Sequence, residues 1–214
     1  CREIIEATMS GTKLPVSVKL RSAINCRDAL QCVSNADGDA LQCVSTERGK
    51  ITALDFIKFM KDLPIAAVMV HGRPYEKPFD GEIDFEMIKA VKKMFKGVVV
   101  GNGGIKTPED AKIMLEKTGV DGIGLARGLY GRPYLFSQIK RYLKTGKYKT
   151  VSQKEIIKLI LRHACLAEKA KGRHGLMELR KHLLWYVSGW PNAKELRGKL
   201  VKVENISEIK RIFK

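Results

Sequence analysis

Residues 97–133, GVVVGNGGIKTPEDAKIMLEKTGVDGIGLARGLYGRP, contain two apolar runs, each of which ends in a glycine-containing turn. The run at 97–100 is rich in β-branched residues, which is typical of a buried parallel strand. TPED at 107–110 predicts the start of a helix, with threonine as the N-cap and proline in the first turn, and Gly119 predicts its end. The run at 120–125 predicts a second strand. The stretch therefore predicts strand, helix and strand, the repeating unit of α/β folds.

The two turns in this stretch favour a phosphate site. GNGG at 101–104 follows the first predicted strand, and ARG at 126–128 follows the second. In (β/α)8 barrels, the loops after the seventh and eighth strands commonly hold a phosphate. Glycines allow a positive φ and let backbone N–H groups approach a ligand closely. The alternative is that these glycines only form tight turns between strands and helices.

The preceding sequence continues the same alternation. Strands are predicted at 14–21 and 66–70, and helices at 51–61 and 84–95. Four parallel strands with three helices between them make the C-terminal half of a (β/α)8 barrel of the TIM-barrel type. Half a barrel leaves two open sheet edges. We therefore expect an N-terminal half-barrel, either missing from this chain or supplied by a partner, to complete it.

Two basic residues mark the end of the first predicted strand. Ser17, Lys19 and Arg21 share one face because side chains alternate along a strand. A charge that points into a barrel needs a partner, so this pattern favours a ligand site over an edge strand with a solvated face. His71 follows the next strand and is a candidate hydrogen-bond donor, although a single histidine is more often structural.

A direct repeat interrupts the α/β pattern. DALQCVS occurs at 28–34 and again at 39–45, and two copies are too few for a solenoid, which needs about three. We predict a repeat-containing insertion at 22–49, in a loop after the first strand. The alternative is a metal or redox loop built on its three cysteines. Their spacing fits no zinc pattern, and the chain's five cysteines contain no CxxC pair, so we expect no metal site.

The positive charge is concentrated in the last third of the chain. Residues 132–214 hold 21 Lys and Arg against 6 Asp and Glu, a net charge of +15, whereas residues 1–131 hold 19 against 17, a net charge of +2. This asymmetry indicates a near-neutral body joined to a module that binds a polyanion. The alternative is a lysine-rich surface typical of a thermophilic or AT-rich organism. No apolar run reaches the ~20 residues of a membrane span and no signal-peptide pattern is present, so we expect a cytoplasmic protein without a membrane partner.

The sequence after residue 133 predicts helices only, at 134–143, 152–171 and 175–187. The last of these combines Arg180 and Lys181 with His182 and Trp185, a mixture that suits recognition of a phosphate backbone and a stacked base. The alternative is that Trp185 and its neighbour Tyr186 are core residues. The expected domains are therefore 1–133, an α/β half-barrel, and 134–214, a basic all-α domain.

Taken together, five motifs resemble those of tRNA-dihydrouridine synthases: PVSVKLR at 15–21, VHGR at 70–73, GNGGI at 101–105, GLARGLYGRPYLF at 124–136 and RKHLLWYVSG at 180–189. Their order and spacing match that family over nearly the whole chain, except for the predicted insertion. The resemblance implies an FMN-containing (β/α)8 barrel followed by a helical domain that binds tRNA. It also implies reduction of the C5–C6 bond of specific uridines by reduced FMN, with NADPH as the source of electrons.

The resemblance also assigns roles to individual residues. Lys19 is similar to the lysine that contacts the flavin ring near its N1/C2 carbonyl, and His71 to the histidine close to the ring. The residues that would enclose the FMN phosphate are Asn102, Gly103, Gly104, Ala126 and Arg127. The residues that would face the substrate or contact tRNA are Arg21, Arg73, Arg180 and Lys181.

Two departures from the family pattern bear on activity. The family's proton-donating cysteine lies in an Asn-x-Gly-Cys-Pro segment, which does not occur in this sequence, so no catalytic residue is assigned. Ala126 stands where the family usually has glycine. The chain is therefore interpreted as a synthase fragment that lacks the catalytic cysteine segment. One alternative is a non-catalytic RNA-binding module derived from that family. Another is a different FMN-phosphate barrel with a small-molecule substrate, but the basic C-terminal third of the chain argues against this second alternative.

Overall fold

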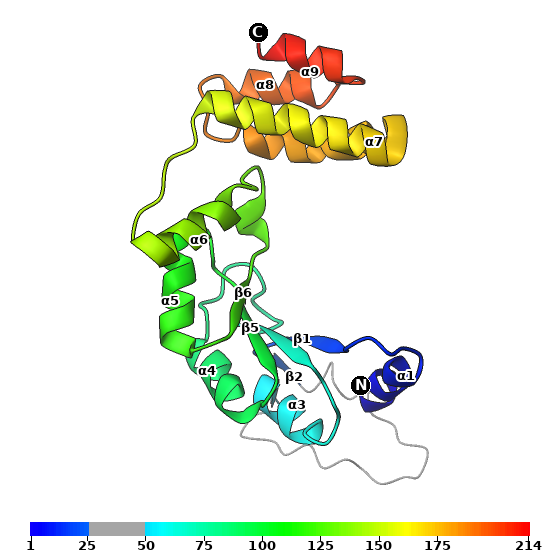
Figure 1. The fold of residues 1–214 in the computed structure, drawn as a ribbon, viewed down its shortest axis with the longest axis vertical. Coiled ribbons are helices and arrows are strands. Elements are labelled where there is room, and N and C mark those ends of the chain that lie inside the picture. The colour runs from blue at the N-terminus through cyan, green and yellow to red at the C-terminus, as the bar shows by residue number, and fades with distance from the viewer. Residues whose placement is uncertain (26–49) are drawn as a thin grey trace. The chain divides into compact units, whose positions relative to one another are not determined.

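The computed structural model describes residues 1–25 and 50–214, which form two compact units, Cys1–Ala126 and Arg127–Lys214 (Figure 1). The division lies before the expected boundary at residue 133, because residues 127–133 pack on the helical unit. A Cβ placed on Gly131 would lie 2.4 Å from the carbonyl oxygen of Trp185. In the part of the chain that the structure describes, no helix is both long and apolar enough to cross a bilayer.

The first unit is built on a parallel four-stranded sheet in the order β1-β4-β5-β6. Its strands are β1 (Ser17–Arg21), β4 (Ala67–His71), β5 (Val98–Asn102) and β6 (Gly122–Gly124). Consecutive strands are neighbours, which confirms the predicted alternation of parallel strands and crossover helices. The last strand is shorter than the predicted 120–125. Just before it, the carboxylate of Asp121 accepts hydrogen bonds from the Val99 N–H at 2.8 Å and from Lys92 Nζ at 2.6 Å.

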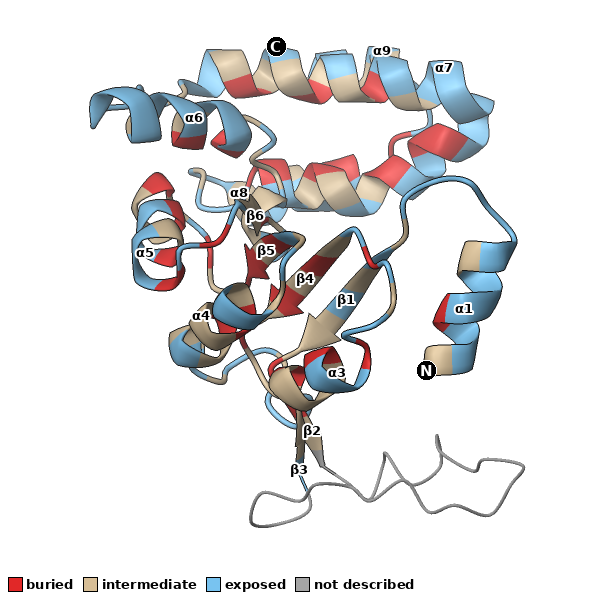
Figure 2. Cartoon of the chain, turned by 60° about the horizontal axis from the view of Figure 1, so that its bottom comes forward, coloured by how far each residue is buried: buried red, intermediate tan, exposed pale blue. Residues whose placement is uncertain are grey.

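Helices α3 (Ala53–Phe59), α4 (Phe85–Met94) and α5 (Pro108–Thr118) connect the strands. They cover the sheet face that carries Val68, Val70 and Val99, all of which are fully buried. The packing is close, since a Cβ on Gly101 would lie 2.8 Å from the sulfur of Met114 in α5. Figure 2 shows these buried residues in red in β4 and β5, whereas β1 at the sheet edge is intermediate or exposed.

The opposite face of the sheet is more open. The register aligns Lys19 with Met69, and Met69 with Val100. Lys19 is exposed, and the other two side chains are half-buried. This is the face that would point into a barrel, and it carries the side chains at the strand ends described below.

The helix that the sequence predicts most completely is α5. Thr107 is its N-cap, Pro108 opens it, and Thr107 and Asp110 form a reciprocal capping box. Gly119 ends it with a φ of 68°, in the left-handed region. These local rules confirm the helix boundaries expected from the sequence.

The insertion predicted at 22–49 and the helix predicted at 51–61 both begin a few residues before the corresponding features of the structure. Strand β2 (Ala23–Asn25) pairs antiparallel with β3 (Lys50–Thr52), so both strands belong to the fold. Ser22 is only 2 % exposed, and its N–H donates to the His71 carbonyl at 2.8 Å. Helix α3 then starts after its N-cap, Thr52. The DALQCVS repeat and Cys26, Cys32 and Cys43 lie outside the described residues.

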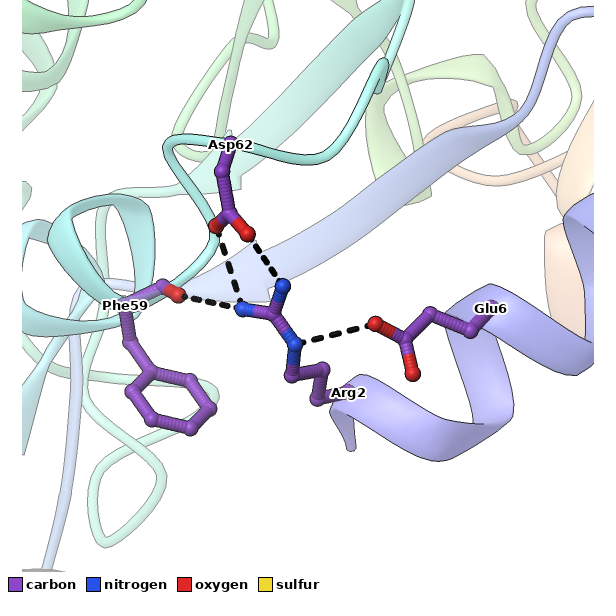
Figure 3. Close-up of polar contacts among 4 residues, drawn as sticks. All are labelled: Arg2, Glu6, Phe59 and Asp62. Atoms are coloured by element: carbon purple, nitrogen blue, oxygen red, sulfur yellow. Dashed lines mark hydrogen bonds and ion pairs between the residues drawn. The ribbon is translucent and has the colours of Figure 1, made fainter.

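Helix α1 (Arg2–Ser10) is joined to the end of α3 by a cluster around Arg2 (Figure 3). The guanidinium donates to both carboxylate oxygens of Asp62, to the Phe59 carbonyl at 3.2 Å and to Glu6 at 3.0 Å. The hydrogen bonds from Arg2 hold the pKa of Asp62 below its usual value. Because the cluster is solvent-exposed, we expect it to position α1 rather than to stabilise the unit strongly.

The second unit is helical, with a 3-10 turn at Arg127–Leu129. Its helices are α6 (Leu135–Thr145), α7 (Gln153–Tyr186), α8 (Ala193–Leu200) and α9 (Ile206–Ile212). Helix α7 is divided at Gly172, whose φ of 58° and ψ of −147° are not helical. The break leaves two helical arms, a first arm before Gly172 and a second arm after it. These arms confirm the separate helices predicted at 152–171 and 175–187.

The two arms of α7 fold back on each other around a small residue. A Cβ on Gly175 would lie 2.2 Å from the carbonyl oxygen of Ala167, so the second arm crosses the end of the first at a distance that only glycine permits. The fully buried core of this unit includes Ile160, Leu183 and Leu200. Tyr186 is also buried in it, so the core interpretation of that aromatic is confirmed.

The first arm of α7 has a strong N-terminal cap. The Ser152 side chain accepts from the Glu155 N–H, and the Glu155 carboxylate accepts from the Ser152 N–H at 2.8 Å. These bonds from Ser152 lower the pKa of Glu155 to about 2. The cap fixes where the arm begins, as its sequence, SQKE at 152–155, indicates.

Candidate functional site

The carboxyl ends of the four parallel strands place their last residues in one row. Arg21 is in register with His71, His71 with Asn102, and Asn102 with Gly124. Ligands of parallel α/β sheets bind beyond this edge, where the loops that follow the strands meet. Three of the candidate residues chosen from the sequence are therefore neighbours, although they are far apart in the chain.

Arg21 lies between a histidine and a tyrosine. Its Nη1 is 3.4 Å from His71 Nδ1, and its Cζ is 5.7 Å from the ring centroid of Tyr75. A guanidinium has no acceptor, so a hydrogen bond here requires Nδ1 to accept it. Tyr75 was not predicted, because a single aromatic residue in a loop gives no periodic signal.

Asn102 has a structural role that its sequence position does not reveal. It is only 7 % exposed, and its Nδ2 donates to the Gly124 carbonyl at 2.7 Å. A Cβ on Gly124 would lie 3.0 Å from that nitrogen. The Asn102 side-chain amide thus links β5 to β6, and the absence of a Cβ at Gly124 leaves space for that amide.

The turn after β5 brings the main chain close to the histidine. Gly103 has a φ of 119° and Gly104 a φ of 72°, a region that favours glycine. A Cβ on Gly103 would lie 2.9 Å from His71 Cδ2 and 2.8 Å from Ile83 Cδ1. The glycine pair is therefore required both by its backbone conformation and by the approach of the His71 ring.

The first turn of α5 is already occupied by an acidic side chain. The N–H groups of Lys106 and Thr107 both donate to an Asp110 carboxylate oxygen at 2.9 Å. These two N–H groups, which immediately precede α5, are therefore already bonded within the protein.

The remaining candidates of the α/β unit differ in their surroundings. Lys19 is exposed and, within residues 1–25 and 50–126, no ion pair is found for it. Arg73 Nε donates to the Gly81 carbonyl and so holds the loop after β4. Ala126 is exposed at the end of this unit, whereas Arg127 belongs to the helical unit. The family resemblance predicts that Ala126 and Arg127 belong to the same FMN phosphate site.

The two basic candidates of the helical unit are not equivalent. Arg180 is half-buried, and its Nε donates to the Val203 carbonyl at 2.8 Å. Lys181 is exposed, and Trp185, one turn later on α7, is 50 % exposed. Arg180 therefore also holds the segment after α8, while Lys181 is available to a ligand.

A second histidine site lies between the two arms of α7. His163 Nδ1 is 3.2 Å from the hydroxyl of Tyr186, and the rings of His163 and His182 are 6.1 Å apart. Burial, and to a smaller extent the neighbouring His182, lower the pKa of His163. The neutral form therefore predominates near neutral pH, as suits a ring that packs beside the core.

Comparisons with known proteins assign the chain to a family. A family model described as dihydrouridine synthase matches residues 42–213. The tRNA-dihydrouridine synthase B of Pseudomonas putida is 30% identical over 205 residues, which cover 95% of this chain and 54% of that protein. A probable tRNA-dihydrouridine synthase of Rickettsia conorii is 34% identical over 198 residues, which cover 92% of this chain and 53% of that protein.

A solved structure of mandelate oxidase with benzoyl-formic acid covers 74% of this chain and 57% of its own, at 19% identity and a TM-score of 0.30, which is too low to inform the fold. This chain spans about half the length of the curated relatives that it matches, 54% of the Pseudomonas putida protein. With most of its sequence matched by the family model, the chain belongs to the dihydrouridine synthase family.

Proposed function

We propose that this chain is the part of a tRNA-dihydrouridine synthase that carries the FMN phosphate site and the tRNA-binding helical domain. The complete enzyme reduces the C5–C6 bond of uridine in tRNA, with FMN as the cofactor and NADPH as the reductant. The observation that carries the proposal is the row of Arg21, His71 and Asn102 at the carboxyl edge of the sheet, next to the turn of Gly103 and Gly104.

In the proposed complete fold, a second half-barrel precedes this sheet and closes it into a (β/α)8 barrel. The open sheet face, with exposed Lys19 and half-buried Met69 and Val100, supports this arrangement. Closure would also pair the free edge of β1, which is otherwise a liability for a parallel sheet. The experiments below use a completed enzyme, in which the upstream part of the Pseudomonas putida relative is fused before residue 1.

The residues of this chain fit FMN in two respects. A flavin phosphate needs backbone N–H donors, and the turn of Gly103 and Gly104, both with positive φ, is of the kind that offers them. A flavin ring needs a cation near N1 and the C2 carbonyl, and Lys19 stands on the open face, two residues before the end of β1. When bound and reduced, FMN supplies the hydride.

The side chains of this site would stabilise charge on the flavin and would orient the flavin and the RNA. Lys19 would lie beside the flavin ring and would stabilise negative charge on its reduced form. His71 would offer a hydrogen bond to the ring. Arg21, held by His71 and Tyr75, and Arg73, held by Gly81, present cations to the RNA phosphates. Asn102 would support the phosphate site from β5.

A non-catalytic RNA-binding module is the second candidate. It is favoured by one observation, that no Asn-x-Gly-Cys-Pro segment occurs in the 214 residues. The absorption spectrum of the completed enzyme, purified without added cofactor, separates the two. Flavin bands near stoichiometric content support the synthase, and tight tRNA binding without any flavin supports the module.

We expect the helical unit to carry the RNA affinity. Lys181→Ala in the completed enzyme should weaken tRNA binding and flatten the plot of log K against log[salt] by about one unit, because one phosphate contact is lost. Arg180→Ala should weaken binding as well, and it should also lower thermal stability, because the bond to Val203 is lost. Filter binding at several salt concentrations measures both slopes.

The matched control for this experiment is Lys96→Ala, which removes an exposed lysine from the α/β unit. It should leave the slope and the affinity close to those of the parent. Equal slopes for Lys181→Ala, Arg180→Ala and the parent protein would contradict the assignment of tRNA contacts to this helix.

A further inference from the structure

Two large aromatic side chains of the helical unit lie side by side on its surface. Tyr130 follows the 3-10 turn at Arg127–Leu129, and Trp185 lies in the last turn of α7. Their ring centroids are 5.2 Å apart with an interplanar angle of 43°. Tyr130 is 44 % exposed and Trp185 50 % exposed. Half of each side chain therefore remains in contact with solvent despite their mutual packing.

The backbone on both sides of the pair is fixed. The Tyr130 N–H donates to the Arg127 carbonyl at 3.1 Å, and the Ser188 N–H donates to the Trp185 carbonyl at 3.2 Å. Gly131, with a φ of 67°, lies against the Trp185 backbone, where a Cβ would be 2.4 Å from its carbonyl carbon. The two rings are thus presented in a set arrangement before any ligand binds, which lowers the entropy cost of binding.

The core of the unit does not depend on these exposed faces. The next residue, Tyr186, is buried and supplies the aromatic packing at this end of α7. Trp190, the other tryptophan, packs on Phe213 with ring centroids 6.0 Å apart. The exposed pair is therefore free to serve a ligand.

The sequence around the pair is free of acidic residues. Residues 122–154, which include Tyr130, hold eight Lys and Arg and no Asp or Glu. Residues 179–194, which include Trp185, hold three Lys and Arg and no Asp or Glu. The exposed Lys181 is one helical turn before Trp185. These two segments are therefore basic, which complements a polyanion, and exposed aromatics among cations are typical of sites that stack unpaired bases.

We infer that Tyr130 and Trp185 form a platform on which an unpaired base of the RNA stacks, with the adjoining phosphate on Lys181. The inference rests on the proposed function only in that the polyanion is RNA. Every base has a flat apolar face, so the platform selects unpaired over paired nucleotides rather than one base over another. Duplex RNA hides those faces in its own stack.

The two tryptophans allow a direct test on the 214-residue chain. Trp190→Phe leaves Trp185 as the only tryptophan, and Trp185→Phe leaves Trp190. We expect a single-stranded oligouridylate to quench the emission of the Trp190→Phe variant, because a stacked base contacts the indole. A duplex RNA of equal length should quench it far less, and the Trp185→Phe variant should respond to neither.

Affinity provides the second measurement. Trp185→Ala should weaken binding of the oligouridylate by about tenfold, and Trp185→Phe should recover most of that loss because an aromatic face is kept. The matched control is Met177→Ala, which truncates another exposed apolar side chain of α7 and should bind like the parent. Circular dichroism establishes that each variant keeps its helices.

The outcomes separate this inference from the proposed function. If the oligouridylate binds without quenching and Trp185→Ala binds like Met177→Ala, the stacking platform is overturned while the synthase assignment is unaffected. Equal quenching by single-stranded and duplex RNA would also overturn it. If single strands quench Trp185 selectively but the completed enzyme forms no dihydrouridine, the platform stands and the synthase proposal fails.

Discussion

Lys19→Ala in the completed enzyme is expected to lower kcat for uridine reduction by about 100-fold, the scale of losing one pre-organised charge from an active site. Lys19 is exposed on the open face of the sheet, two residues before Arg21, which pairs with His71. In this position it would contact the flavin ring. Its loss would remove the charge that we propose stabilises the reduced ring. The tRNA affinity should remain unchanged, because the RNA affinity is assigned to the helical unit. Steady-state assays with NADPH and tRNA measure kcat, which includes the reduction of the flavin that the lost charge would slow.

The matched control is Lys13→Ala, which removes an exposed lysine before β1 and should leave kcat at the parent value. The flavin of the Lys19→Ala variant should also have a more negative reduction potential, because the reduced form loses its counter-charge. A variant with normal kcat and potential but lost tRNA binding would show that Lys19 belongs to the RNA site.

Gly175→Ala is expected to destabilise the helical unit by about 3 kcal/mol, at the upper end of what overpacking costs. The added Cβ would lie 2.2 Å from the Ala167 carbonyl oxygen and 2.8 Å from its carbon. Both are backbone atoms, so no side-chain rotation relieves the clash, and the two arms of α7 must separate. Both tryptophans lie in the helical unit, so denaturation followed by tryptophan fluorescence reports on that unit.

The control is Gly198→Ala, a change in the exposed interior of α8 where a Cβ meets nothing within 4 Å. It should stabilise the unit by about 0.5–1 kcal/mol, the difference in helix propensity between the two residues. Similar midpoints for Gly175→Ala and the parent would mean that the arms of α7 are not packed as described.

Local sequence rules predicted the parts of the fold that depend on a few adjacent residues. The capping residues Thr107 and Asp110 and the left-handed Gly119 fixed α5, and the parallel strands followed from the alternation of apolar runs and helices. The pairing of β2 with β3 was not predicted, because strands of three residues give no periodic signal and their partners are separated by the repeat segment.

The sequence predicted which candidate residues stand at the strand ends, but it did not predict their contacts. The alternation of β1 indicated that Lys19 and Arg21 share a face, and the ends of β4 and β5 marked His71 and Asn102. The contact of Arg21 with Tyr75 and the bond from Asn102 to Gly124 depend on tertiary packing. The bond from Arg180 to Val203 also depends on it. No local sequence pattern reveals which polar side chains form structural hydrogen bonds within the fold.

Dihydrouridine formation in unmodified tRNA, detected by mass spectrometry of its nucleosides, tests the central claim most directly. With FMN and NADPH supplied, the completed enzyme should convert uridine to dihydrouridine, and its Lys19→Ala variant should do so far more slowly. The 214-residue chain alone should form none, because it has no Asn-x-Gly-Cys-Pro segment to supply the proton. Dihydrouridine formed by the 214-residue chain, or none formed by a completed enzyme that is folded and loaded with flavin, would contradict the account.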